Sequence, residues 1–153
     1  MPTPARGILA EWIVAFPGVQ ILDVTGPHEV FALANRVRRL RPAPLCPVDR
    51  GAHDGSASDV GWALDRDAGL LDGRRATTHW RSLPWMRESF PAVTVEEKLH
   101  VVEDGHVLTS AGISAGIDMA LRVVARYHGE AIADATARHM EYRYHPQDNG
   151  RRV

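Results

Sequence analysis

Short apolar runs typical of strands alternate along this chain with apolar residues at the 3.6-residue spacing of helices. The pattern predicts strands and helices within one fold. The first apolar run, residues 8–16, is short, contains valine and isoleucine, and stops at Pro17-Gly18. We expect a buried strand there, followed by a turn. Residues 19–24 are predicted to form a loop.

A helix is predicted to begin at Thr25-Gly26-Pro27, because proline suits the first helical position, where its missing N–H costs nothing. Glu29 would then lie in the first turn, where the helix dipole favours an anion. The helix is expected to fade near residues 38–40, since Pro42 follows. The apolar stripe of this helix has helical spacing and consists of Val30, Phe31, Ala34 and Val37.

Residues 41–68 show neither spacing. They hold three of the ten prolines and five aspartates, so we predict an irregular loop. A loop of this length is unusual inside a compact domain, where connections are short. A single domain is expected over residues 1–145, followed by a polar, frayed tail at residues 146–153.

Regular spacing returns after residue 69. A short strand is predicted at 75–79, a short helix at 84–89 and a brief extended piece at 93–95. Two apolar runs around Glu103-Asp104-Gly105 are typical of a β-hairpin over residues 100–109. Helices are expected at 114–127, ended by Gly129, and at 130–142. Strands that alternate with helices indicate an α/β fold.

The composition is that of a folded globular protein, with 44% hydrophobic and 24% charged residues among 153. A net charge of −1 leaves no basic excess, which argues against direct nucleic-acid binding. The single cysteine, Cys46, excludes an internal disulfide framework and fits a reducing compartment. The chain has no apolar run of membrane-spanning length and no signal-peptide pattern, so we expect a soluble cytoplasmic protein.

Three segments, in this order, carry a family resemblance. The first two read VAFPGVQILDVTGPHEVFALAN at 14–35 and AGLLDGRRATTHW at 68–80, and the third runs from Phe90 to Tyr142 and contains VLTSAGISAGIDMAL. Together they resemble the DJ-1/PfpI (ThiJ) family of class I glutamine amidotransferase-like proteins, and within it the isonitrile hydratases and the N-terminal domain of AraC-type regulators. The resemblance implies a doubly wound, flavodoxin-like, mostly parallel sheet between helices, usually in a dimer.

The resemblance also implies site residues. Members of this family carry a reactive cysteine on a strained strand-to-helix turn, approached by an acidic side chain from the first loop. By motif, the acid is Asp23, and the histidine near the nucleophile is His79. From the residues alone, the favoured interpretation of Asp23 is a loop carboxylate that bonds backbone N–H groups. His79 could equally be a structural histidine bonded to backbone.

The centre of the chain departs from the family pattern. Where relatives carry further strands, helices and a Cys-Thr-Gly-type elbow, this chain has only residues 41–67. The segment before Gly69 offers no cysteine or serine followed by a helix signal, and Cys46 lies too far upstream, between Leu45 and Pro47. We therefore expect an incomplete sheet without the family nucleophile. Residues 41–68 are either a real loop or the result of a deletion or frameshift.

Other candidate sites have simpler interpretations. The small-residue turn around Gly112 could present N–H groups to an anion, but capping of the next helix by Ser114 is favoured. His100 and His106 could face each other across the hairpin, yet no histidine pair has a compact zinc spacing. We expect neither a metal nor a cofactor. The tryptophans are expected to be packing groups: Trp12, Trp62, Trp80 and Trp85.

Three functions stay open. The favoured one is a catalytically impaired DJ-1/PfpI-like remnant or a small binding or regulatory module, because the nucleophile is missing. The second is an isonitrile hydratase- or amidase-like enzyme acting on a small carbon–nitrogen substrate, with Cys46 as nucleophile and Asp23 assisting. The third is an effector-sensing partner of an AraC-type regulator. Expected partners are a small-molecule ligand and a second copy of the chain, with no nucleic acid and no membrane.

Overall fold

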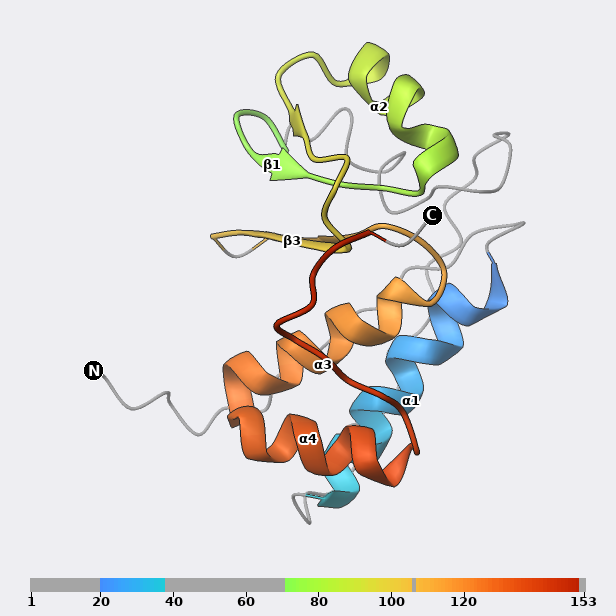
Figure 1. Cartoon of the computed structure of the whole chain (residues 1–153), viewed down its shortest axis with the longest axis vertical. Helices are drawn as coiled ribbons and strands as arrows, with labels where there is room; N and C mark the ends of the chain where they lie inside the picture. The colour runs from blue at the N-terminus through green and yellow to red at the C-terminus, as the bar shows by residue number, and fades with distance from the viewer. Residues whose placement is uncertain (1–19, 38–70, 106, 152–153) are drawn as a thin grey trace.

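The computed structural model describes residues 20–37, 71–105 and 107–151. The predicted strand at 8–16 and the predicted loop at 41–68 lie outside these residues. In chain order (Figure 1) the elements are α1 (Ile21–Val37), β1 (Arg75–Ala76), the 3-10 turn η1 (Trp80–Ser82), α2 (Leu83–Ser89), β2 (Thr94–Val95), β3 (Val101–Asp104), β4 (Val107–Ser110), α3 (Ala115–His128) and α4 (Glu130–His139).

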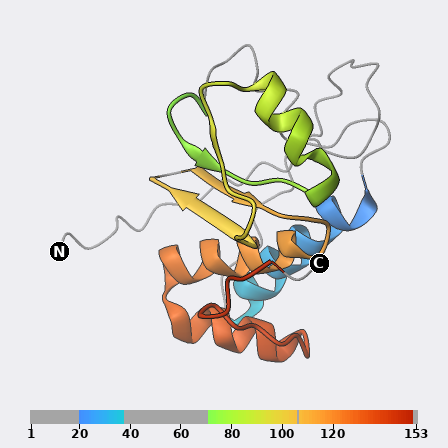
Figure 2. The ribbon, with the colours of Figure 1, turned by 45° about the horizontal axis from the view of Figure 1, so that its top comes forward.

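The strands lie between three helices on one side and one helix on the other. Helices α1, α3 and α4 pack together on one side of the strands, and α2 lies on the other side (Figures 1 and 2). Strands β1 and β2 pair in parallel, whereas β3 and β4 pair antiparallel. The α/β class is therefore confirmed. The described strands form two small sheets, which do not establish the expected doubly wound, flavodoxin-like sheet.

The core has two parts. The larger part joins α1, α3 and α4 through Val30, Leu121, Val124 and Ala133, each at most 2% exposed. The smaller part lies under α2 and contains Leu71, Ala76, Met86, Phe90 and Val93. Of the apolar stripe predicted for the first helix, Val30 and Ala34 are buried in this core and Phe31 packs against it, as helical spacing requires.

The hairpin and the end of α3 follow the sequence prediction. Val101 pairs with Ser110 and Asp104 with Val107, and Gly105 turns the chain with a φ of 64°. Gly129 ends α3 with a φ of 90°, and its N–H bonds to the Ala125 carbonyl oxygen. Glycine adopts these left-handed angles without steric cost. Helix α2 and the extended residues of β1 and β2 also lie where they were predicted, although both strands are shorter.

Helix α4 ends three residues earlier than predicted. Glu141 adopts a φ of 53°, so the chain reverses there. The Glu141 N–H then bonds to Arg138, and the Tyr142 N–H bonds to Ala137. This is the hydrogen-bond pattern of a Schellman cap. Glycine normally marks such a cap, and a glutamate in its place gives no signal in the sequence.

The predicted start of α1 is wrong. The helix begins at Ile21, six residues before the proline, so Pro27 lies inside it. An interior proline cannot donate to the carbonyl of the residue four positions earlier and disfavours a helix. Here tertiary packing compensates, because Pro27 is buried and its ring lies against Gly116 of α3. One position earlier, Gly26 lies against Ile117.

The prediction of a frayed tail is also wrong for the described residues. Gly150 forms a bridge with Leu99, and the His100 N–H donates to the Asn149 carbonyl at 2.9 Å. The Asn149 side chain bonds to both backbone groups of Val101. We call residues 142–151 the C-terminal segment. Its last three residues, 149–151, therefore lie beside residues 98–101 and give backbone groups at the start of β3 partners.

The contact between α1 and α3 yields a first prediction. A side chain at position 26 would begin only 3.0 Å from Ile117 Cγ1, so Gly26→Val should lower the free energy of unfolding by about 1–3 kcal/mol. Gly116→Ala is the matched control, because its new carbon would lie at an ordinary 3.6 Å from Pro27. That change should leave stability equal or raise it by up to about 1 kcal/mol. Urea denaturation of both variants measures the difference, and equal midpoints would contradict this packing.

Candidate functional site

Asp23 lies in the first turn of α1 rather than in the loop expected for it. Its side chain is half-buried, and its N–H donates to the Gln20 carbonyl at 2.9 Å. A carboxylate in this position is favoured by the helix dipole. The early start of α1 therefore changes the surroundings of Asp23 from a loop to a rigid helical turn.

His79 follows β1 and begins η1. Its Nδ1 accepts a long hydrogen bond, 3.4 Å, from the Arg81 backbone N–H, so in this geometry the ring proton is on Nε2. The Cδ2 edge of the ring lies 3.5 Å from the point where a side chain on Gly112 would begin. His79 thus combines a backbone contact with a position against the turn that precedes α3.

The structure brings the segments of Asp23 and His79 to the same end of α3. Gly26, three residues after Asp23, packs on Ile117, and His79 lies against Gly112. The first turns of α1 and α3 lie side by side in both ribbon views (Figures 1 and 2). The candidate thiol, Cys46, lies outside the described residues.

Large apolar side chains are exposed on the segments that meet at this end of α3. Ile21 is 72% exposed and Trp80 is 48% exposed, and Leu22 and Ile113 exceed a third. Trp80 carries the Arg81 guanidinium 5.0 Å above its ring instead of packing into the core. Of the other tryptophans, Trp85 packs edge-on against Phe90, and the remaining two lie outside the described residues. Single exposed apolar residues are ordinary, but four of them on neighbouring segments mark this end of the fold as a surface suited to contact.

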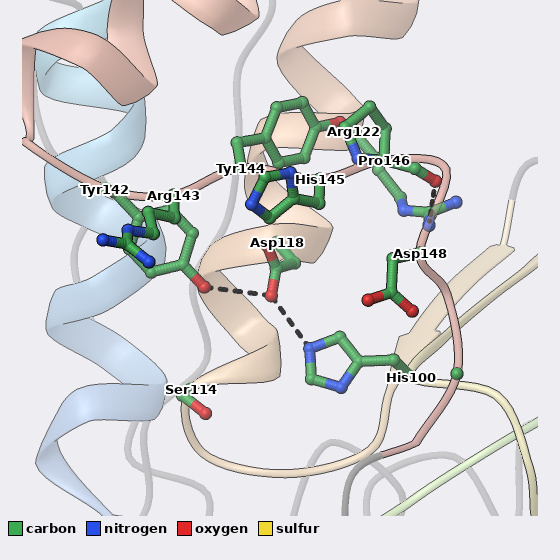
Figure 3. Close-up of a pocket in the computed structure, with 11 residues that line it drawn as sticks. His100, Ser114, Asp118, Arg122, Tyr142, Arg143, Tyr144, His145, Pro146 and Asp148 are labelled. Carbon is green, nitrogen blue, oxygen red and sulfur yellow. Dashed lines mark hydrogen bonds and ion pairs between the residues drawn. The ribbon is translucent and has the colours of Figure 1, made fainter.

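A cavity of about 190 Å³ lies on another face, between α3, the start of β3 and the C-terminal segment (Figure 3). Its walls are mainly polar, and both charge signs are present. The lining residues are His100, Ser114, Asp118, Arg122, Tyr142, Arg143, Tyr144, His145, Pro146, Asp148 and Gly150.

Asp118 is the centre of the cavity's hydrogen-bond network. Its Oδ2 lies 2.8 Å from His100 Nε2 and accepts a hydrogen bond of 3.0 Å from the Tyr142 hydroxyl (Figure 3). One carboxylate thus ties the start of β3, helix α3 and the C-terminal segment together. Ser114 lies one turn before Asp118 and makes no capping hydrogen bond with its side chain, so the predicted capping role is wrong.

Arg122 joins the hairpin to the C-terminal segment. Its Nη2 donates to the Pro146 carbonyl at 3.1 Å, and its Nη1 lies 3.7 Å from Glu103 Oε1. Among the described residues, Arg122 Nε and the Tyr144 hydroxyl are buried without a hydrogen-bond partner. Buried donors of this kind cost free energy unless a water or ligand completes them.

Burial also changes the acidity of the two cavity tyrosines. Burial, the negative charge of Asp118 and the hydrogen bond to Asp118 all raise the pKa of Tyr142 above its usual 10.0. Burial raises the pKa of Tyr144 to about 12, with Glu130 adding to the increase and Arg122 opposing it. Both phenols therefore stay protonated throughout the physiological range, and the Tyr142 hydroxyl donates to Asp118.

This arrangement can bind but shows no metal site. Within residues 20–37, 71–105 and 107–151, no group of three metal-binding side chains comes together. His100 faces Asp118, and His106 is outside the described residues, so the proposed histidine pair is not tested. One sequence signal could have located the cavity: Ser114, Asp118 and Arg122 recur every four residues, the spacing of one helix face. In the part of the chain that the structure describes, no helix is long and apolar enough to cross a bilayer.

Comparison with curated proteins finds relatives of two kinds, although no family model matches the chain. Isonitrile hydratase from Pseudomonas putida is 30% identical over 175 aligned positions, which cover 83% of this chain and 75% of the hydratase. The HTH-type transcriptional regulator CdhR from Pseudomonas aeruginosa is 40% identical over 89 residues, 58% of this chain. The chain spans only about a quarter of the length of CdhR, since the match covers 26% of it.

Solved structures agree on the fold. An AraC family transcriptional regulator from Pseudomonas putida has a TM-score of 0.65 at 16% identity, over 85% of this chain and 100% of the other. DJ-1beta from Drosophila melanogaster has a TM-score of 0.62 at 14% identity, over 86% and 96%. A ThiJ/PfpI family protein from Pseudomonas syringae has a TM-score of 0.61 at 22% identity, over 97% and 85%.

The tyrosines give a second prediction. A group whose pKa is higher in the folded than in the unfolded state stabilises the fold below the unfolded pKa, and this contribution is lost as pH rises through the folded pKa. For the cavity tyrosines that window opens near pH 10 and extends to about 12 and beyond. Ultraviolet titration should therefore show two of the three tyrosines ionising late, with stability falling over the same range. Asp118→Asn should bring the Tyr142 transition to lower pH, and an unchanged titration would contradict the contact.

Proposed function

The chain belongs to the DJ-1/ThiJ/PfpI family, as its motifs predicted, and we propose that it is a binding domain of this family without cysteine chemistry. The proposed site is the cavity beneath the C-terminal segment. The observation that carries the proposal is the Asp118 network, which fixes His100 and Tyr142 in the cavity wall. Polar groups that are already oriented bind a ligand without the entropic cost of ordering them.

The size and charge of the cavity limit the ligand. An engineered cavity of about 150 Å³ holds benzene, so a cavity of about 190 Å³ suits a molecule of roughly six to ten non-hydrogen atoms. Its lining includes two arginines and two aspartates, whose charges cancel. The expected ligand is therefore a small polar molecule without net charge that both donates and accepts hydrogen bonds.

Two observations support the absence of family-type catalysis. The alignment with isonitrile hydratase has 175 positions, more than the 153 residues of this chain, so the hydratase has positions without counterparts here. Apolar side chains such as Ile21 and Trp80 are exposed around the Asp23 and His79 segments, where a covering block would bury them. Asp23 and His79 are then what remains of the family's acid and histidine.

An enzyme is the second candidate, favoured by the 30% identity to isonitrile hydratase over most of the chain. It would add water to a small carbon–nitrogen substrate, with the Cys46 thiolate as nucleophile and Asp23 and His79 assisting. The third candidate is a regulatory sensor that acts through a homodimer or an AraC-type partner, favoured by the 40% identity to CdhR.

Ligand binding is tested by thermal unfolding with a library of small uncharged polar molecules. A compound present at 100 times its Kd should stabilise the wild type by about 2.7 kcal/mol. Asp118→Asn should abolish that gain, because it weakens the hydrogen bonds that fix the wall. Asp72→Asn is the matched control, since Asp72 is exposed and distant in sequence from the cavity lining. Compounds that stabilise Asp118→Asn as strongly as the wild type would contradict this site.

Cysteine chemistry is tested separately. We expect iodoacetamide to label Cys46 no faster than a model thiol at neutral pH, because nothing in its sequence surroundings lowers its pKa. We also expect no turnover of isonitriles, nitriles or amides. Turnover that disappears in both Cys46→Ala and Asp23→Asn would establish the enzyme candidate and overturn the non-catalytic proposal.

A further inference from the structure

The side chain of Arg151 reaches from the end of the described chain to the residues just before His79. Its Nη2 donates to Thr77 Oγ1 at 2.6 Å and to the Thr78 carbonyl at 2.8 Å. Thr77 and Thr78 are buried, with at most 2% exposed. The contact therefore joins residues more than 70 positions apart inside the protein rather than on its surface.

Thr77 joins Arg151 to two other segments of the chain. Its hydroxyl donates to the Glu96 carbonyl at 2.6 Å, after β2. Its N–H donates to Thr109 Oγ1 of β4 at 2.9 Å. Because the Thr77 hydroxyl proton is used on Glu96, its lone pairs face the guanidinium, and the direction of each bond is fixed.

Arg151 is itself held in place. Its backbone N–H donates to the Lys98 carbonyl at 2.7 Å, and its neighbours Asn149 and Gly150 bond to residues 99–101. The guanidinium thus extends from an anchored backbone. This separates Arg151 from an exposed arginine, which loses side-chain entropy for little gain.

The partners of this guanidinium leave its charge uncompensated among the described residues. Burial lowers the pKa of Arg151, which means that its surroundings disfavour the charge. Its contacts among the described residues are a hydroxyl and a carbonyl, with no carboxylate, and its Nε has no hydrogen-bond partner there. A partly buried charge with neutral partners costs desolvation that these bonds only partly offset.

We propose that Arg151 is a positioning residue for His79. By fixing the Thr77 hydroxyl and the Thr78 carbonyl, it sets the direction in which the chain leaves β1, and so holds the His79 ring against Gly112. Since the C-terminal segment also lines the Asp118 cavity, it connects the cavity to the family's histidine position. The proposal goes beyond the proposed function and does not depend on a ligand in the cavity.

The test follows the His79 ring and the Thr77 amide by NMR in the unliganded full chain. Arg151→Ala should shift the His79 ring nitrogen signals away from the tautomer protonated on Nε2, and should speed Thr77 amide exchange about tenfold. In Arg151→Lys both changes should be smaller than in Arg151→Ala, because lysine retains a donor. Arg138→Ala is the matched control, since Arg138 is exposed on α4, and it should leave both signals unchanged.

A role in stability alone predicts a lower melting temperature without a change in the His79 ring signals, and that result in folded Arg151→Ala would overturn the proposal. If Arg151→Ala does not fold, Thr77→Val removes the acceptor and leaves the arginine in place. His79 signals that match the wild type in folded Thr77→Val would overturn the proposal equally, and shifted signals would support it. Loss of ligand binding in the cavity has no bearing on either readout.

Discussion

The hydrogen bonds between the C-terminal segment and the start of β3 are the interaction on which the other features of this structure depend. The Asn149 side chain donates to the Val101 carbonyl at 2.8 Å and accepts from the Val101 N–H at 2.9 Å. It thereby satisfies the two backbone groups that a neighbouring strand would pair. An isolated two-stranded hairpin is marginal in water, and an open edge leaves backbone groups without partners. The Asn149 amide gives both backbone groups of Val101 a partner.

Several features follow from this attachment. With Asn149 fixed, the segment lies above α3, so Tyr142 reaches Asp118 and Arg122 reaches the Pro146 carbonyl. The same attachment presents Arg151 to the residues before His79. A cavity with oriented polar walls and a held histidine thus arise from one strand-like contact.

The family assignment and the local features were accessible from the sequence, because each is encoded by neighbouring residues. Gly105 and Gly129 marked the hairpin and the end of α3, since only glycine takes those angles freely. The start of α1 was not accessible, because the proline rule for helix starts was outweighed by the packing of Pro27 on Gly116, a contact between distant segments. The end of α4 was missed because a glutamate occupies the left-handed position. The roles of Asp23 and His79, and the consequence of the segment over residues 41–68, stay predictions.

The cavity was missed for a related reason. Its hydrogen-bonded partners lie 18 to 24 residues apart, and the polar composition of residues 142–151 gives no sign of specific hydrogen bonds. Composition indicates whether a segment can be buried, whereas the contacts of a polar segment depend on which groups on other elements need partners. In this chain that need came from the edge of β3.

The most direct measurement is native-state hydrogen exchange at three backbone amides that link the C-terminal segment to the residues around the start of β3. The His100 N–H donates to Asn149, the Val101 N–H to the Asn149 side chain, and the Arg151 N–H to Lys98. Our account predicts that all three exchange as slowly as the amides between β3 and β4, and that Asn149→Ala speeds the three together while the hairpin stays protected. Exchange of the three amides at the rate of an unstructured chain in the wild type, with the hairpin still protected, would contradict it.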